Sequence, residues 1–326
     1  MISINQRSAV IVRQMVDDGE ALGIRALRLS NGVTVVDCGV EVPGSLEAGR
    51  LFACACLGGL GQISFTQQTF PGRDAADPCF WLPSVTASIS HPPIACMASQ
   101  YAGWAIRLDK YFAIGSGPAR ALYAGEDIYR KLDYRDQSDT AVLMLEGRDL
   151  PGEAVASFVA ERCRIRPERL MILVAPTASL TGSVQIAARA AETGLHKLAE
   201  LGFDIRKVKS ALGQCPLAPV AGDDLRAIGR TNDAVLYGSR VFFTVEAEND
   251  ELAALIDKVP SSSSRDYGVP FYELFMKYEQ DFYRIDPLLF SPAEVEMNSV
   301  SSGRTFHAGY LNSSVIKASL LECEPC

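Results

Sequence analysis

Two residues of opposite charge, Arg189 and Glu192, stand three positions apart in a segment made mainly of Ala, Val, Ile and Leu. At about 100° per residue, they fall on one polar stripe of a helix together with Gln185 and His196. A carboxylate beside a guanidinium can act as a general base, and the surrounding small residues would let a ligand come close. The same spacing also occurs in surface ion pairs that contribute a few tenths of a kcal/mol. Periodicity alone favours the surface pair.

The segment that carries this stripe is predicted to be one helix over residues 183–201. Val184 and Leu195 belong to its packing face, whereas Lys197 and Glu200 lie further round, where we expect solvent. The helix begins with TGS directly after the apolar segment LMILVAP, which we predict to be a buried strand. Ligands of α/β sheets bind at the carboxyl ends of strands, so this position favours a site.

Two further segments are candidates for binding polar groups. The motif GSGPAR contains Gly115, Ser116 and Arg120 and could hold an anion through free amides at a helix start. It lacks the Gly-Lys-Ser/Thr ending of a P-loop and the GxGxxG spacing, and a tight turn explains it equally well. SSSSRDYG contains Arg265 and Asp266, and a solvated loop is its simpler interpretation. Neither segment by itself names a substrate.

The histidines and cysteines argue against a metal centre or a disulfide framework. His91, His196 and His307 are not at ligand spacing, so we predict no protein-bound metal. The nine cysteines are odd in number and scattered through apolar segments, which favours reduced thiols in a cytoplasmic protein. Cys323 and Cys326 form an isolated CEPC sequence, which we interpret as an inert tail.

Composition excludes several function classes. The 326 residues are 48% hydrophobic and 21% charged, which is typical of a globular protein. A net charge of -8 argues against nucleic-acid binding and against attachment to an anionic membrane. The start, MISINQRSAVIVRQMVDD, does not resemble a secretory signal, and the apolar runs are too short to span a bilayer.

The first part of the chain mixes helices and strands. Residues 5–22 show helical periodicity, and IRALRLSNGVTVVDCGV is typical of a β-hairpin around Asn-Gly. SLEAGRLFACACLGGLG is predicted to be a helix capped by Ser45, and QISFTQQTF and SVTASIS are predicted strands. YFAIGSGPARALYA reads as a strand, a Gly-Ser-Gly turn and a helix that starts at Pro118.

From residue 141 onward, strands and helices alternate. AVLMLE and LMILVAP are predicted buried strands separated by a helix over 152–163, which indicates parallel pairing with crossover helices. AVLYGSRVFFTVEA is predicted as strand, DELAALIDKVP as helix, and AEVEMNSVSSGRTFHAGYL as a β-hairpin. We therefore expect a mixed α/β fold with both parallel and antiparallel pairing.

The length of the chain predicts two domains. The most polar interruption, LDYRDQSDT at 132–140, places the boundary between an N-terminal α/β domain at 1–140 and a C-terminal α/β domain at 141–326, with segments able to exchange.

A series of segments, in order over nearly the whole chain, resembles the methenyltetrahydromethanopterin cyclohydrolase family. These segments are NGVTVVDCGV, LEAGRLFACACLGGLG, IACMASQYAGWAI, YFAIGSGPARAL, APTASLTGSVQIAARAAETGLHK, GRTNDAVLYG, SSSSRDYGVPFYELF, DFYRIDPLLFSPAE and SGRTFHAGYLN. The resemblance implies hydrolysis of the 5,10-methenyl group of tetrahydromethanopterin to the N5-formyl compound, without metal or redox cofactor. It implies two α/β domains that enclose a pocket, a homotrimer, and a cytoplasmic role in one-carbon metabolism, either in methanogenesis or in formaldehyde oxidation.

The resemblance also assigns residues. The family's catalytic arginine and glutamate fall on Arg189 and Glu192. The methenyl carbon is already part of a delocalised, electrophilic cation, so the reaction still requires only a base that activates water. Glu192 would be this base. Arg189 would fix the rotamer of this carboxylate and stabilise its charge.

The substrate is a pterin whose side chain carries a phosphate, and the matched segments supply its expected contacts. These are Gln185, Ser99, Gln100, Gly115, Ser116, Arg120, Thr231, Asn232, Asp233, Arg265 and Asp266. His196 is expected to lie outside the pocket.

Two other functions remain open at this point. One is a non-catalytic pterin or phosphate-ligand binding protein on the same scaffold, which would leave the methenyl group intact. The other is a dinucleotide-dependent dehydrogenase, against which the missing GxGxxG counts.

Overall fold

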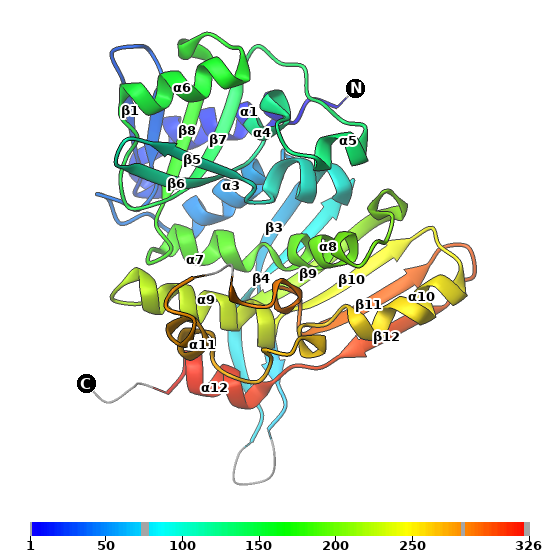
Figure 1. Cartoon of the computed structure of the whole chain (residues 1–326). Coiled ribbons are helices and arrows are strands. Elements are labelled where there is room, and N and C mark those ends of the chain that lie inside the picture. Colours follow the sequence, from blue (N-terminus) through cyan, green and yellow to red (C-terminus); the bar gives the residue numbers. More distant parts are fainter. Residues whose placement is uncertain (1, 73–77, 282–283, 323–326) are drawn as a thin grey trace. The chain divides into compact units, whose positions relative to one another are not determined.

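The computed structural model describes residues 2–72, 78–281 and 284–322. These residues form two compact units (Figure 1). Unit 1 lies within Met1–Ile63 and Pro93–Gln185, and unit 2 lies within Ser64–Pro92 and Ile186–Cys326. The tail with Cys323 and Cys326 lies outside the described residues.

The boundary expected at 140/141 falls inside unit 1. Residues 132–140 do form a polar interruption, but the strand that follows them, β7 (Ala141–Glu146), pairs with β6 (Tyr111–Ser116) before it and with β8 (Leu170–Ala175) after it. Sheet pairing therefore holds both sides of the interruption in one unit. The chain instead passes between the units after Ile63, Pro92 and Gln185.

Unit 1 is built on a six-stranded mixed sheet in the order β1-β2-β8-β7-β6-β5. Its other strands are β1 (Arg25–Arg28), β2 (Thr34–Asp37) and β5 (Trp104–Leu108). β8 pairs in parallel with β2 and β7, and the remaining pairs are antiparallel. This mixture, the Asn-Gly hairpin between β1 and β2, and the parallel pairing of the two apolar strands confirm the sequence analysis.

Helices cover both faces of this sheet. The helices of this unit are α1 (Ile4–Asp17), α2 (Gly19–Leu22), α3 (Leu46–Cys56), α4 (Ala119–Tyr123), α5 (Ile128–Leu132), α6 (Glu153–Cys163) and α7 (Leu180–Ala187), whose last two residues belong to unit 2. Leu143 of β7 packs in one cluster with Val159 of α6, whereas Met144 packs in another with Val12 of α1. Because successive side chains of a strand point to opposite faces, a strand buried on both faces is apolar throughout, as AVLMLE is.

One element of unit 1 was not anticipated. Residues 93–100 form a π-helix, η1 (Pro93–Gln100), which contains the predicted contacts Ser99 and Gln100. π-Helical turns are rare and occur frequently at functional sites. The wider turn gives no periodicity that the 3.6-residue pattern detects, so the sequence analysis missed it.

Unit 2 is built on a second six-stranded sheet in the order β12-β11-β10-β9-β4-β3. The strands are β3 (Gly61–Phe70), β4 (Phe80–Ser90), β9 (Val208–Pro216), β10 (Arg240–Val245), β11 (Glu294–Ser299) and β12 (Thr305–Gly309). β10 and β11 pair in parallel, whereas β4–β9, β9–β10 and β11–β12 are antiparallel. The C-terminal hairpin is confirmed as β11 and β12.

The helices of unit 2 are α8 (Ala190–Glu200), α9 (Asp224–Gly238), α10 (Asn249–Leu255), α11 (Phe271–Lys277) and α12 (Ser313–Leu320). The prediction of strand for AVLYGSRVFFTVEA was wrong in its first part, since AVLYG forms the last turns of α9. The side chain of Asp223 caps this helix by accepting from Arg226 N, many residues before the apolar run. A short window around AVLYG does not include that start signal.

The single helix predicted over 183–201 is divided into α7 and α8. Arg189 lies at the break, with φ -91° and ψ 0°. Its N–H donates to Ile186 O at 2.9 Å, which tightens the end of α7. Its carbonyl accepts from Thr193 N at 2.9 Å and thereby begins α8. The break makes Arg189 the N-cap residue of a new helix.

Candidate functional site

Arg189 and Glu192 form a buried pair at the start of α8. Arg189 Nη1 lies 3.5 Å from Glu192 Oε2, and the side chains are only 11% and 6% exposed. Exposed pairs contribute little because solvent screens them, whereas a buried carboxylate needs its partners. The pair is therefore not the surface ion pair that periodicity alone favoured.

The surroundings of Glu192 favour a negative charge. Glu192 lies in the first turn of α8, where the aligned peptide dipoles of a helix stabilise an anion. The Arg189 guanidinium adds a positive charge at 3.5 Å. A carboxylate that is shielded from bulk water can accept a proton from a water molecule that adds to an electrophile. This is the chemistry that the local geometry supports.

Close packing on the sheet of unit 2 holds α8 in place (Figure 1). A Cβ added at Gly213 of β9 would lie 3.1 Å from Ala191 N, and one added at Gly194 would lie 3.0 Å from the ring of Phe243. The two glycines thus let the first turns of α8 approach β9 and β10 closely. A larger residue at Gly213 would push against the turn that carries Glu192.

Lys197, expected to face solvent, is 1% exposed. Its ammonium donates to Leu288 O and, at 3.2 Å, to Ser263 Oγ. Burial lowers the pKa of Lys197 from 10.5 to about 8, and the Asp286 carboxylate opposes this effect. The prediction was wrong because the loops around Ser263 and Leu288 cover this side of α8, and periodicity cannot show which faces distant loops cover. Lys197 ties these loops to the helix that carries Glu192.

Gln185, on α7 of unit 1, contacts an acidic residue that the sequence analysis missed. Its Nε2 lies 3.5 Å from Oε2 of Glu146, and Thr177 Oγ1 donates to Oε1 of the same carboxylate at 2.5 Å. Glu146 is the last residue of β7, and Thr177 follows β8, so the group lies at the carboxyl ends of two parallel strands. The sequence does contain a signal for Glu146, since it is a charged residue at the end of the apolar run AVLMLE.

Arg120 is fully buried, and protein groups occupy most of its donors. Nε and Nη2 donate to the two oxygens of Glu126 at 3.0 and 2.5 Å. Nη1 donates to Met97 O at 3.2 Å and to Ser99 O at 2.9 Å. The guanidinium thus caps the carbonyls at the end of η1, and a substrate phosphate would have to displace Glu126 to reach it. The structure supports a structural role for Arg120 rather than a phosphate contact.

The other predicted contacts of unit 1 cluster around the same turn. Ser99 Oγ donates to Cys56 O at 2.6 Å, and Gly117 N donates to Ser99 O at 2.7 Å. Ser116 is buried, and its Oγ lies 3.5 Å from Cys56 Sγ. Gly115, which precedes it at the end of β6, is buried as well. Gln100, the last residue of η1, is also buried. The structure therefore brings η1 and the GSGPAR turn together.

Thr231, Asn232 and Asp233 lie on α9 in unit 2, and the first two bond to their own helix. Thr231 Oγ1 donates to Ala227 O at 2.7 Å, and Asn232 Nδ2 donates to Ile228 O at 2.8 Å. These bonds occupy the side chains locally. Neither residue contacts Arg189 or Glu192 through a hydrogen bond in the described part of the chain.

Asp233 is a buried carboxylate that joins three helices. Its Oδ1 accepts from Phe271 N, at the start of α11, at 2.7 Å. Its Oδ2 accepts from Ser319 Oγ of α12 at 2.6 Å. Burial raises the pKa of Asp233 from 3.8 to about 7, although both hydrogen bonds oppose this rise. These contacts favour a role in helix packing.

We expect Asp233→Asn to change how stability depends on pH. A carboxyl whose pKa is raised by folding contributes stability below pH 4 that is lost as the pH rises towards 7. Asn carries no charge at any pH, so the variant should gain about 1–4 kcal/mol relative to wild type between pH 4 and pH 8. Urea unfolding across this range measures the difference. A difference that stays constant with pH would contradict the raised pKa.

Arg265 and Asp266 have different environments in their loop. The side chain of Asp266 is buried, and its oxygens accept from Tyr278 OH at 3.0 Å and from Asp286 N at 2.9 Å. Arg265 is exposed, and its backbone N–H donates to Asp286 Oδ2 at 3.4 Å. Asp266 therefore shapes the loop, whereas Arg265 is available to a ligand.

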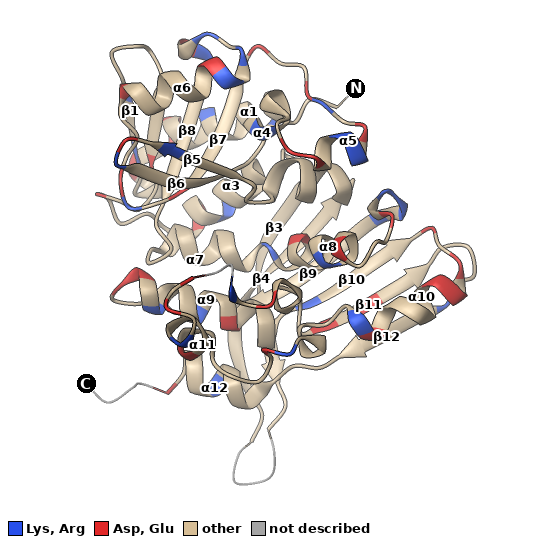
Figure 2. Ribbon diagram, viewed as in Figure 1, with Lys and Arg blue, Asp and Glu red and all other residues tan. Residues whose placement is uncertain are grey.

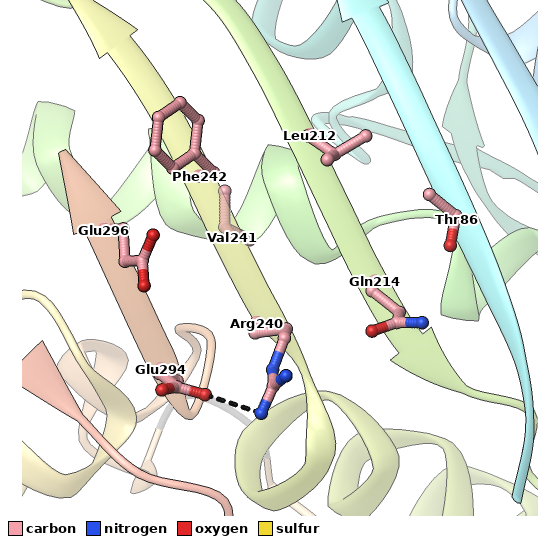
Figure 3. Close-up of a pocket in the computed structure, with 8 residues that line it drawn as sticks. All are labelled: Thr86, Leu212, Gln214, Arg240, Val241, Phe242, Glu294 and Glu296. Carbon is pink, nitrogen blue, oxygen red and sulfur yellow. Dashed lines mark ion pairs between the residues drawn. The ribbon is translucent and has the colours of Figure 1, made fainter. Parts of the chain in front are cut away.

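A hollow of about 360 Å³ in unit 2 lies on the sheet (Figure 3). It is lined by Thr86, Leu212, Gln214, Arg240, Val241, Phe242, Glu294 and Glu296. Arg240 Nη2 pairs with Glu294 Oε2 at 3.0 Å. Gln214 and Phe242 alternate with Gly213 and Phe243, which face α8, so the hollow lies on the opposite face of the sheet from Glu192. It includes none of the predicted site residues.

Figure 2 shows basic and acidic residues interspersed along the elements of both units. Among the described residues, no cluster of three His, Cys, Asp or Glu side chains is placed to hold a metal ion. Within the same residues, the helices are too short or too polar to cross a membrane. His196 Nε2 lies 3.9 Å from Glu200 Oε1, at the far end of α8 from Glu192.

Comparisons with known proteins identify relatives over almost the full length. A family model described as Cyclohydrolase (MCH) matches residues 3–320. The chain is 45% identical over 327 residues to a methenyltetrahydromethanopterin cyclohydrolase of Methanocaldococcus jannaschii, covering 98% of each chain. It is 42% identical over 318 residues to that of Methanococcoides burtonii, covering 97% of each. It is 44% identical over 322 residues to that of Methanothermobacter marburgensis, covering 98% of this chain and 99% of the relative.

Proposed function

This chain belongs to the cyclohydrolase (MCH) family, and on that premise we propose that it hydrolyses the methenyl group of methenyltetrahydromethanopterin to N5-formyltetrahydromethanopterin. The buried pair of Arg189 and Glu192 at the start of α8 is the observation on which we assign the reaction to particular residues. A surface pair could not exclude bulk water from a reacting cation. A buried carboxylate beside a guanidinium can exclude it.

The first step is addition of water to the methenyl carbon. This carbon bridges N5 and N10 and shares a positive charge with them, so it needs no further activation. Glu192 accepts one proton as the water oxygen bonds to carbon, and a neutral carbinolamine forms. General-base catalysis by a positioned group contributes about a hundredfold to ten-thousandfold in rate.

The second step breaks the bond from carbon to N10. Glu192 returns its proton to N10 as this bond breaks, and it then takes the proton of the carbinol hydroxyl. The formyl group stays on N5, and one proton is released overall. One carboxylate thus serves as base and as acid in turn, which its position beside the reacting atoms allows.

Arg189 has a positioning role in this scheme. Its guanidinium lies 3.5 Å from Glu192 Oε2 and limits the rotamers of the carboxylate. It also stabilises the ionised form before water adds. Since the substrate is itself a cation, the negative charge of Glu192 offsets the repulsion between Arg189 and substrate.

The chemistry we propose uses no metal or redox cofactor, because the substrate carbon is already electrophilic and no electrons are transferred. Of the remaining predicted contacts, Arg265 is the exposed cation that suits the substrate phosphate. We also propose a cytoplasmic location and a homotrimeric state, which the sequence resemblance implies. Light scattering on the purified protein tests the oligomer.

The test of the proposed function is a spectrophotometric assay with methenyltetrahydromethanopterin, run beside methenyltetrahydrofolate. We expect the methenyl absorbance to disappear with the first compound and to persist with the second. Binding without loss of absorbance would instead indicate a non-catalytic pterin-binding protein. No change with either compound would contradict the proposal.

A further inference from the structure

Unit 1 has a basic hollow of about 270 Å³ at the end of α6, where basic residues gather (Figure 2). It is lined by Tyr123, Arg135, Phe158, Glu161, Arg162 and Arg164. The lining carries three guanidiniums and one carboxylate, although the net charge of the chain is -8. A concave surface of mainly one sign raises the local concentration of ions of the opposite sign. The hollow contains none of the residues assigned to the proposed hydrolysis.

The three arginines have donors to spare. Within the described part of the chain, none of their side chains forms an ion pair with a carboxylate. Arg135 Nη2 donates to Leu122 O at 3.2 Å, which occupies one of five N–H donors. The side chains of Arg162 and Arg164 donate no hydrogen bond to any of the same residues. An anion in the hollow would therefore not have to displace an acidic residue of the protein.

The guanidinium of Arg162 is positioned by aromatic rings. Its Cζ lies 5.1 Å from the ring centroid of Phe158 and 5.9 Å from that of Tyr123. The Tyr123 ring is itself stacked on Trp104, with centroids 4.7 Å apart. Stacking limits the rotamers of an arginine and leaves the N–H groups at its edge available, and these groups match phosphate oxygens in pairs. The rings thus prepare Arg162 for an anion before one binds.

Arg164 occupies a backbone position that favours glycine. It ends α6 with φ 56° and ψ 42°, in the left-handed region. Its N–H donates to Glu161 O at 3.0 Å, and the N–H of Ile165 donates to Ala160 O at 3.1 Å. Helices that end in this way usually carry Gly at this position, because a Cβ is strained there. Strain of this kind is concentrated at functional sites, which favours a use for the Arg164 side chain.

We propose that this hollow binds a small anion that carries phosphate groups, held by the guanidiniums of Arg135, Arg162 and Arg164. The planar fork of a guanidinium bonds two phosphate oxygens at once, which an ammonium does not do. The volume of the hollow suits a compact ligand. Inorganic phosphates and small phosphate monoesters share this chemistry. The site is separate from that of the proposed hydrolysis.

Isothermal titration calorimetry of the full chain tests the site, with inorganic pyrophosphate and glycerol 3-phosphate as probes at constant ionic strength. We expect saturable binding of at least one probe. The double variant Arg162→Gln with Arg164→Gln should bind it at least about tenfold more weakly, because each guanidinium supplies charge-assisted hydrogen bonds. Tighter binding of pyrophosphate would identify inorganic phosphates as the ligand class, and tighter binding of glycerol 3-phosphate would identify phosphate monoesters.

The matched control removes two exposed arginines of unit 1 that lie outside the hollow. It is the double variant Arg28→Gln with Arg130→Gln, on β1 and α5. Its affinity should stay within about twofold of wild type, because salt screens distant exposed charges. Equal weakening in the two double variants would indicate a general effect of net charge and overturn the site. Absence of saturable binding to wild type would overturn it as well.

Arg164→Gly separates binding from folding. Glycine relieves the strain at the end of α6, so the urea midpoint should rise. Affinity for the preferred probe should nevertheless fall by at least about threefold, since one guanidinium is lost. A variant that is more stable and binds as tightly as wild type would overturn the site of three arginines.

Kinetics of methenyl hydrolysis keep this inference apart from the proposed function. The double variant Arg162→Gln with Arg164→Gln should leave both kcat and KM unchanged. A raised KM would assign the hollow to the phosphate of the substrate and overturn a separate site. An inactive wild type that still binds pyrophosphate would support the site and overturn the proposed hydrolysis alone.

Discussion

Glu192→Gln should lower kcat for methenyl hydrolysis by at least about a hundredfold, because the amide cannot accept the proton of the attacking water. The substitution keeps the size of the side chain and an oxygen that can face Arg189, so the variant should fold and bind substrate. KM should rise, but by less than kcat falls, because the amide no longer offsets the repulsion between Arg189 and the cationic substrate. Steady-state kinetics, followed by the loss of methenyl absorbance, measure both constants.

Glu200→Gln is the control for this experiment, since Glu200 lies at the other end of α8 and its side chain is 52% exposed. We expect its turnover to match wild type. Equal losses in the two variants would show that α8, and not the carboxylate of Glu192, had been disturbed. Turnover by Glu192→Gln within a few fold of wild type would remove Glu192 from the proposed mechanism.

The second large effect is expected on stability. Arg120→Met should lower the free energy of unfolding by about 3–5 kcal/mol, because it leaves the Glu126 carboxylate and the last carbonyls of η1 without their donor. The rings of Tyr101 and Tyr129, whose centroids lie 5.2 and 5.7 Å from Arg120 Cζ, would also lose their cation. Urea unfolding measures the loss.

Arg130→Met provides the comparison for Arg120. Arg130 lies nearby on α5, but its side chain is 87% exposed and its ion pair with Asp127 is on the surface. This variant should lose less than about 0.5 kcal/mol. Should Arg120→Met be as stable as Arg130→Met but bind substrate poorly, Arg120 would be a phosphate ligand after all, as the GSGPAR motif first indicated.

Local sequence signals predicted the helices, strands and turns that form because of residues within them or next to them. The sequence alone predicts the Asn-Gly turn between β1 and β2, the Ser45 cap of α3 and the apolar strands β7 and β8. Each depends on a turn residue, a cap or burial on both faces of a strand. The mixed sheets follow from the alternation of these elements.

Features that depend on distant contacts were missed. The break at Arg189 and the π-helix η1 interrupt the regular period on which the predictions relied. The burial of Lys197 results from loops more than sixty residues away in the chain. Periodicity identifies the faces of a helix but cannot say which distant segment covers each face.

The candidate site was predicted in part. Arg189 and Glu192 were identified through the family resemblance, and the structure adds that they are buried together. Arg120 and Asp266 were chosen for their charge, but their contacts with Glu126 and with Tyr278 are internal. A charged residue in a matched motif can serve the fold or the ligand, and only its partners distinguish the two roles.

The most direct test of the central claim, that the Glu192 carboxylate is the base, is chemical rescue of Glu192→Ala by formate. Removal of the side chain leaves space beside Arg189 into which a small carboxylate fits. We predict that turnover is low without formate and rises in proportion to its concentration, by at least about tenfold, whereas Glu192→Gln gains nothing. Near-normal turnover by Glu192→Ala without formate, or a low rate that formate leaves unchanged, would contradict the account.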